Sequence, residues 1–182
     1  MLANFTVKKL TLDNCQLELL ENFNRYQEIK RCWRKEDNVW VLKDIAFIEQ
    51  WGDEKKSKIV AGFKECIKKG GIIIAVYLND NLIAFSCIEN RLFGSKNEYI
   101  NLDSIQVSYE FRRHGLGRLL FNNSCEEAKI LGAKKLYISA NSSEETQAFY
   151  KFVGCCETAE INRELFEKEP FDVHMEYSLY LK

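Results

Sequence analysis

The 182-residue chain has the length of one domain, and we expect residues 1–182 to form a single domain with a sizeable core. Its 26 basic and 27 acidic residues leave a net charge of −1, so no overall field attracts nucleic acid or an anionic membrane, and we expect neither as a partner. The sequence contains no apolar run of about 18 residues and no basic start followed by an apolar segment. These features predict a soluble, cytoplasmic protein.

The cysteines indicate neither a metal site nor a disulfide framework. Their number is odd, no C-x-x-C pair occurs, and only two histidines could join them around a metal ion. We therefore expect no bound metal, and mostly reduced, buried thiols that pack as small apolar side chains. The seven are Cys15, Cys32, Cys66, Cys87, Cys125, Cys155 and Cys156.

The first 71 residues have the least regular pattern. A short strand is predicted from Asn4 to Lys9, followed by a helix that Asp13 caps. Residues 25–52 contain all three tryptophans with charged residues between them and show no clean period. A helix with an apolar stripe is predicted to open at Ser57 and to end at Gly70-Gly71.

The strongest strand signals follow. Ile72–Leu78 and Leu82–Glu89 flank the turn-forming residues Asn79-Asp80-Asn81, which predicts a β-hairpin. A further strand, Tyr99–Ser108, leads into a helix whose apolar and small residues stop at Gly132. Leu136–Ala140 is predicted to be a strand parallel to its predecessor, because a helix crosses over between the two.

Two more elements complete the chain. Ser142-x-x-Glu145 has the capping-box spacing and predicts a helix that ends at Gly154, with Phe149 and Phe152 packed inward and Tyr150 on another face. The alternation from Phe171 to Leu179 predicts a strand with one solvated face, on which His174 is a surface residue. The order of helices and strands predicts a mixed α/β fold.

The heptapeptide FRRHGLG, Phe111–Gly117, joins a strand to a helix in a tight turn. Its two glycines leave room for a group to approach the backbone, and the helix start offers unpaired N–H groups and the positive end of its dipole. With Arg112, Arg113 and Arg118 nearby, the turn predicts a phosphate site. It lacks the third glycine of a dinucleotide fingerprint and the Gly-Lys-Ser/Thr of a Walker loop, and a plain surface turn is the remaining alternative.

These motifs resemble those of the GNAT superfamily of acetyl-CoA-dependent N-acetyltransferases. The resemblance rests on Ile105-x-Val107, on Arg112-x-x-Gly115-x-Gly117 opening a helix, and on Ala148-Phe149-Tyr150-x-x-x-Gly154 closing a later one. It is specific from about Leu102 to Gly154. It implies a central twisted mixed sheet of six or seven strands flanked by about four helices, with acetyl-CoA as co-substrate.

The resemblance also implies a set of residues that bind the cofactor. The strand would lend its main chain to the pantetheine arm, the turn would bind the diphosphate, and one of the residues around Asn141 would replace an asparagine that family members often carry. The implied residues are Ile105, Gln106, Val107, Arg112, Arg113, His114, Gly115, Leu116, Gly117, Arg118, Asn141, Ser143, Thr146 and Tyr150.

The acceptor amine must lose a proton before it attacks the thioester. Asp103 shares a face with Ile105 and Val107 if the strand is regular, which makes it the first candidate base; Glu98 and water are the alternatives. In the family, the tyrosine at the position of Tyr150 donates a proton to the departing thiolate. We expect direct attack in a ternary complex, without an acyl-cysteine.

The acceptor itself is open. Residues 1–71 are expected to shape its pocket and residues 72–181 to form the sheet and the acetyl-CoA-binding core, and the tryptophans of residues 25–52 either line that pocket or pack in the core. A small molecule or a peptide amine fits equally, as does a monomer or a homodimer. A second class of function is a non-catalytic acyl-CoA-binding module on the same fold.

Overall fold

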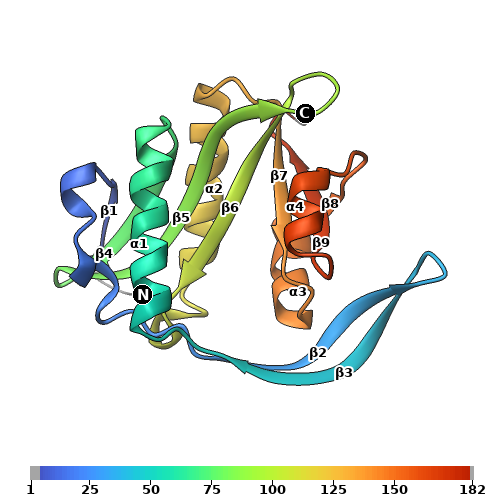
Figure 1. Cartoon of the computed structure of the whole chain (residues 1–182), viewed down its shortest axis with the longest axis horizontal. Helices are drawn as coiled ribbons and strands as arrows, with labels where there is room; N and C mark the ends of the chain where they lie inside the picture. The colour runs from blue at the N-terminus through green and yellow to red at the C-terminus, as the bar shows by residue number, and fades with distance from the viewer. Residues whose placement is uncertain (1–4, 181–182) are drawn as a thin grey trace.

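The computed structural model describes residues 5–180 and has a mixed α/β fold, which confirms the predicted class (Figure 1). A seven-stranded sheet carries four α-helices, and a separate two-stranded hairpin extends from it. In chain order the elements are β1 (Thr6–Lys9), β2 (Gln27–Glu36), β3 (Val39–Glu49), α1 (Asp53–Lys68), β4 (Ile72–Leu78), β5 (Asn81–Phe93), β6 (Tyr99–Val107), α2 (Leu116–Ile130), β7 (Lys135–Ala140), α3 (Glu144–Phe152), β8 (Cys156–Glu157), α4 (Arg163–Lys168) and β9 (Val173–Ser178).

The sheet order is β1-β4-β5-β6-β7-β9-β8. Only the β6–β7 pair is parallel, as predicted from the helix that crosses over between them; the other pairs are antiparallel. Each face of the sheet has its own core. On one face α1 packs Val60 and Phe63 against Phe85, and on the other α2 packs Leu120 against Ile100. In Figure 1, α1 and α2 lie on opposite faces.

The β4–β5 hairpin confirms the strongest sequence signal. Its turn residues Asn79 and Asp80 have φ values of 48° and 62°, the left-handed conformation that a two-residue hairpin turn needs and that Asn and Asp tolerate. β5 continues to Phe93, beyond the predicted end at Glu89, and β6 agrees with its prediction within one residue.

The N-terminal predictions need correction. Asp13 does not cap an α-helix: it lies inside the 3₁₀ turn Leu12–Asn14, which Thr11 caps together with the Asn14 side chain, and a second 3₁₀ turn follows at Leu17–Leu20. The helix predicted from Ser57 begins four residues earlier, at Asp53, where two acidic residues favour the positive helix start. Asn4, the predicted start of β1, lies outside the described residues.

Residues 25–52, which showed no period, contain the hairpin of β2 and β3, hereafter the arm (residues 27–49). Its turn residues Asp37 and Asn38 both have positive φ, 47° and 64°. The arm reaches away from the sheet and passes below the carboxyl-terminal half of the molecule (Figure 1). Apolar residues such as Val39 and Ile48 are exposed along it, so neither of its faces has the uniform burial that produces a clean alternation.

The arm is docked onto the start of α3. Cys32 forms an isolated antiparallel bridge with Ser143, and the Trp33 N–H donates to the Ser142 carbonyl over 2.8 Å. Arg31 makes a bidentate pair with Glu144, with N–O distances of 2.9 and 2.7 Å. The arm therefore connects the two halves of the molecule a second time, independently of the sheet.

Two predictions for the last elements are wrong. His174 is buried, 5% exposed, because α4 covers the face of β9 that was expected to be solvated: the Phe166 ring packs against the imidazole at an interplanar angle of 41°, and Tyr137 shares a 2.8 Å hydrogen bond with it. Phe152 does not pack inward; it is 72% exposed. Tyr150, which was predicted to lie on another face of α3, is the buried aromatic ring of this helix instead.

The remaining findings concern cysteines and membrane spans. All seven cysteines are free thiols; five are buried, Cys66 is half-buried and Cys156 is exposed. Among residues 5–180, no helix combines the length and the apolar character that crossing a bilayer would require.

Ser143, rather than Ser142, caps α3. Its hydroxyl accepts from the Thr146 N–H and donates to Thr146 Oγ1, and the residue is fully buried. We expect Ser143→Ala to lower the free energy of unfolding by about 1 kcal/mol, the usual cost of a lost cap. Urea unfolding measures it. Ser57→Ala on the exposed face of α1 is the control and should change stability by less than about 0.5 kcal/mol; equal losses would contradict the capping role.

Candidate functional site

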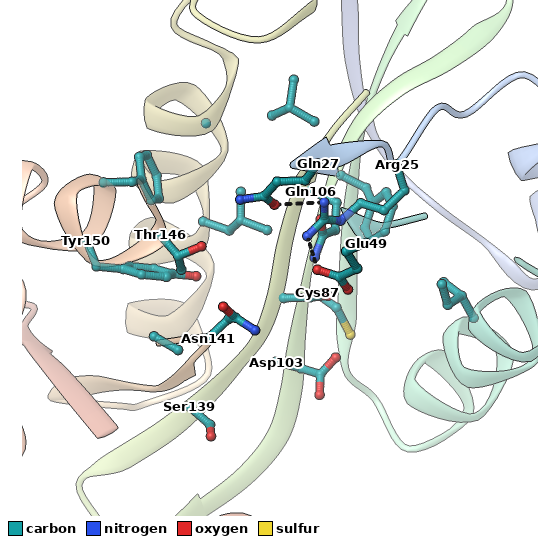
Figure 2. A pocket seen from close by; sticks show the side chains of 18 of the residues that line it. Arg25, Gln27, Glu49, Cys87, Asp103, Gln106, Ser139, Asn141, Thr146 and Tyr150 are labelled. Carbon is teal, nitrogen blue, oxygen red and sulfur yellow. Dashed lines mark hydrogen bonds and ion pairs between the residues drawn. The ribbon is translucent and has the colours of Figure 1, made fainter. Parts of the chain in front are cut away.

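A large cleft, of about 2360 Å³, runs between the two halves of the sheet. It exists because β6 and β7 pair over only three residues, from Tyr99 to Asn101, and then diverge. From Leu102 to Val107, β6 has no strand partner on this side, so its peptide groups border the cleft. Figure 2 shows the cleft with Asn141, Thr146 and Tyr150 on one side and Arg25, Gln27 and Glu49 on the other.

A β-bulge divides β6 at the middle of the cleft. Cys87 pairs with Ser104 and Ile88 with Leu102, so Asp103 is an extra residue without a partner. The bulge resets the alternation: Ile105 and Val107 pack toward the α2 core, whereas Asp103 lies beside Cys87 on the α1 side (Figure 2). The prediction that Asp103 shares a face with Ile105 and Val107 is therefore wrong, because it assumed a regular strand.

The turn between β6 and α2 has the backbone of an anion site. Arg113 and Gly115 have φ values of 65° and 83°, and Gly115, the N-cap of α2, has open space where a Cβ would be. The N–H groups of Leu116, Gly117 and Arg118 lie in the first turn of the helix, where no intrahelical acceptor exists. Because the Leu116 side chain is buried in the core, only its main chain can reach a ligand.

The basic side chains of the turn divide into two groups. Arg112 Nε donates to the Val107 carbonyl over 3.1 Å and its guanidinium stacks on Tyr109, so Arg112 holds the end of β6 in place. His114 Nδ1 hydrogen-bonds to the Arg112 carbonyl over 2.7 Å. Arg113 and Arg118 are exposed and have no ion-pair partner among the described residues, which leaves them available to an anion.

Gly117 allows α2 and α3 to approach each other closely. A Cβ on Gly117 would lie 3.1 Å from Cε2 of Phe149. Close helix packing therefore favours the second glycine of the heptapeptide, which the sequence did not reveal, while the positive φ of Gly115 favours the first.

Tyr150 is 6% exposed, and its hydroxyl makes no hydrogen bond with residues 5–180. Burial raises the pKa of Tyr150 well above its usual value, and the thiol of Cys155 and the carboxylates of Asp103 and Asp172 add to the rise. The phenol therefore stays protonated at neutral pH and is a free donor on the cleft wall.

The start of α3 contributes two further cleft residues. Asn141 is exposed, and its Oδ1 accepts from the Ser143 N–H, while Thr146 lines the cleft one turn later. The Gln147 side chain donates to the Asn141 carbonyl over 2.9 Å, so the peptide oxygen just after β7 has a hydrogen-bond partner where β7 diverges from β6. Ser143 is buried as the helix cap and does not line the cleft, so its side chain is placed away from a bound ligand.

Two carboxylates that line the cleft, Asp103 and Asp172, have raised pKa values. Desolvation first, and the charge of Glu89 second, raise the pKa of Asp103, although its side chain is accessible from the cleft. Desolvation raises the pKa of Asp172 to about 6, with Glu169 and Glu49 adding to the rise and a 2.9 Å hydrogen bond from Ser139 opposing it. Sequence reasoning missed Asp172, because its neighbour Ser139 is 33 residues away.

Glu98, the alternative base, lies outside the cleft. It precedes β6 and forms an ion pair with Lys135, with an N–O distance of 3.5 Å. Of the three tryptophans, Trp51 lines the cleft and stacks on Phe23. Trp33 and Trp40 belong to the arm, where Lys151 lies over the first ring and Glu157 accepts from the second.

The family follows from a match over most of the chain. Residues 23–155 match the model of the acetyltransferase (GNAT) family, so the chain belongs to this family of acetyltransferases, as the motifs predicted. A search among curated proteins found no match.

Solved structures agree on the fold. Nourseothricin acetyltransferase is similar with a TM-score of 0.68 and 15% identity, covering 97% of this chain and 99% of that chain. A putative streptothricin acetyltransferase from Bacillus anthracis str. Ames, solved with acetyl coenzyme A, has a TM-score of 0.68 and 15% identity over 98% and 99% of the two chains. Aminoglycoside 6′-acetyltransferase type Ii follows with 0.63 and 14% identity over 97% and 99%.

The raised pKa of Asp172 predicts a pH-dependent stability. The neutral carboxyl is favoured in the folded state, so the stabilisation is complete below the unfolded pKa of about 3.9 and is lost as the pH rises through about 6. Asp172→Asn should therefore unfold with a free energy higher by about 1 to 2 kcal/mol at pH 7.5, after a discount for solvent screening, and should match wild type near pH 4. Urea unfolding across this range measures the difference. Asp44→Asn on the exposed arm serves as control, and a pH-independent difference for Asp172→Asn would contradict the expectation.

Proposed function

We propose that the protein transfers the acetyl group of acetyl-CoA to a primary amine, by direct attack of the amine in a ternary complex. The observation that carries the proposal is the unpaired edge of β6. This edge runs from the carboxylate of Asp103 to the anion site at residues 112–118. One continuous cleft thus offers peptide groups to an extended chain and N–H groups to phosphates at its end.

The cleft fits coenzyme A on the evidence of its own groups. The peptide groups on the unpaired edge of β6 at Ile105 and Val107 suit the amides of the pantetheine arm, although the Val107 carbonyl already accepts from Arg112 Nε. Gln106 lies between them, and its own N–H and C=O face Phe85 of β5. The open space at Gly115 and the N–H groups that follow suit the diphosphate, with Arg113 and Arg118 as its counter-charges.

Asn141 and Thr146 border the same channel from α3. When bound, acetyl-CoA supplies an activated acetyl thioester. Arg112, His114, Leu116 and Gly117 act on it through the backbone they shape rather than through their side chains, since those side chains are bonded internally, buried or absent.

Two carboxylates and one phenol of the chain move protons. Asp103, at the bulge, accepts the proton of the incoming ammonium, because its raised pKa makes it a better base than an ordinary carboxylate. Asp172 faces the same part of the cleft and can share this work. Tyr150 donates its proton to the departing thiolate from the opposite wall, where no protein group competes for its hydroxyl.

An acceptor screen tests the proposal. Purified protein, acetyl-CoA and a panel of primary amines should release free coenzyme A thiol in proportion to acetylated amine. The second class of function is a non-catalytic module that binds acyl-CoA through the same cleft. It would bind acetyl-CoA in a calorimetric titration yet release no thiol with any amine, and that result would overturn catalysis.

Tyr150→Phe isolates the proton donor, because it keeps the buried ring and removes only the hydroxyl. We expect kcat to fall on the order of 10²-fold with little change in acetyl-CoA affinity. Steady-state kinetics and calorimetry give the two values. Tyr177→Phe, on β9 and outside the cleft lining, is the matched control. A kcat within about threefold of wild type, with chemistry limiting the rate, would show that Tyr150 only packs.

A further inference from the structure

Glu89, Asp103 and Asp172 are ionisable groups of the cleft that form no ion pair within the described residues. Two other acidic residues of the lining are paired: Glu49 with Arg25 at 2.9 Å and Glu164 with Arg91 at 3.4 Å. Lys168, whose charge reaches Asp103, pairs with Glu164 at 3.5 Å. Glu89, Asp103 and Asp172 are therefore left without a compensating ion pair, and Lys55 and Lys69 are the lysines of the lining that also have none within the described residues.

Two bulges bring Glu89 and Asp103 together. Ile88 pairs with Leu102 and Leu92 with Ile100, so three residues of β5, beginning at Glu89, lie opposite a single residue of β6. Asp103 is the extra residue on β6 immediately after the same pair. Glu89 and Asp103 thus both lie in bulges next to the Ile88–Leu102 pair, and both border the cleft from adjacent strands.

Asn101 adds an unpartnered acceptor at this place. It is 3% exposed, lines the cleft, and its Nδ2 donates to Glu89 over 3.1 Å. Because a carboxylate only accepts, this bond fixes the amide orientation and leaves Oδ1 as the free atom. Oδ1 has no hydrogen-bond partner among the described residues, a situation that costs about 1 to 3 kcal/mol for a buried group.

Glu89 and Asn101 Oδ1 together form a receptor for an ammonium group, which carries three N–H donors and a positive charge. A monoamine at Asp103 would leave this receptor empty. At the other end of the acceptor half, Glu49 is already paired with Arg25 and bears no free charge, so the charged end of an acceptor is directed toward Glu89.

Resting on the function proposed above, we infer that the acceptor is an oligoamine, which carries a second ammonium group bound by Glu89 and Asn101 while its first amine is acetylated beside Asp103. Glu89 and Asn101 then determine specificity and take no part in proton transfer.

Matched amine pairs test this inference. The probes are diamines from 1,3-diaminopropane to 1,6-diaminohexane and spermidine, each compared with the alkyl monoamine of the same chain length. At low ionic strength the best diamine should exceed its monoamine in kcat/KM by on the order of tenfold, as one partly desolvated ion pair would give. The ratio should shrink as salt is added, because screening weakens the second contact.

Glu89→Gln should reduce this ratio to within about threefold of one, since the amide keeps the shape and loses the charge. Glu54→Gln, an equal change of net charge on exposed α1 and outside the cleft lining, should retain the wild-type ratio. Thermal melting and acetyl-CoA affinity establish that both variants are folded. If Glu89→Gln does not fold, the diamine-to-monoamine ratio of kcat/KM in the wild-type protein and its salt dependence still test the inference.

The outcomes separate the two proposals. If monoamines are acetylated as well as diamines at every chain length, or if the preference is independent of salt and of Glu89, the oligoamine inference is overturned while acetyl transfer stands. If no amine of either kind releases thiol although acetyl-CoA binds, acetyl transfer itself is overturned, and the inference falls with it.

Discussion

The divergence of β6 and β7 is the constraint on which the site depends. Two parallel strands that separate inside a sheet leave peptide groups without partners, and such groups are costly unless something else bonds to them. On the β7 side the chain provides its own solution: Gln147, 2% exposed, donates to the Asn141 carbonyl. On the β6 side, from Leu102 to Val107, no strand is provided. The sheet therefore has a gap between β6 and β7 that is wide enough for an extended chain, and the start of α2 lies at the carboxyl end of this gap.

The bulges distribute chemistry around this gap. A regular β6 would point Asp103 into the α2 core side with Ile105 and Val107, where a carboxylate would be buried among apolar groups. The extra residue turns Asp103 to the α1 side instead, beside Cys87 and near Glu89, while the edge that faces β7 stays straight enough to pair with an extended ligand. Asp103 and the phenol of Tyr150 thus border the cleft from different walls, which is the arrangement that the proposed proton transfers require (Figure 2).

The sequence predicts correctly the elements that depend on neighbouring residues, and it does not predict the features that depend on contacts between distant residues. The β4–β5 hairpin, the parallel strands and the α2 turn depend on turn residues and periodicity within short windows, and all were predicted. The arm, the bulge at Asp103 and the burial of His174 depend on partners far along the chain: Ser142 for β2, Cys87 for β6, Phe166 for β9. The four predicted helices match the observed number only because the missing N-terminal helix is offset by α4.

The arm has a mechanical consequence. The two halves of the sheet share three residue pairs across the β6–β7 seam, a short hinge about which they could swing. Beyond that seam, β2 pairs with the cap of α3 through Cys32 and Ser143, and Arg31 grips Glu144 at the far side of the gap. These contacts tie the two sides of the cleft together at its open end, which limits how far the sides can separate and reduces the conformational entropy to be lost on binding.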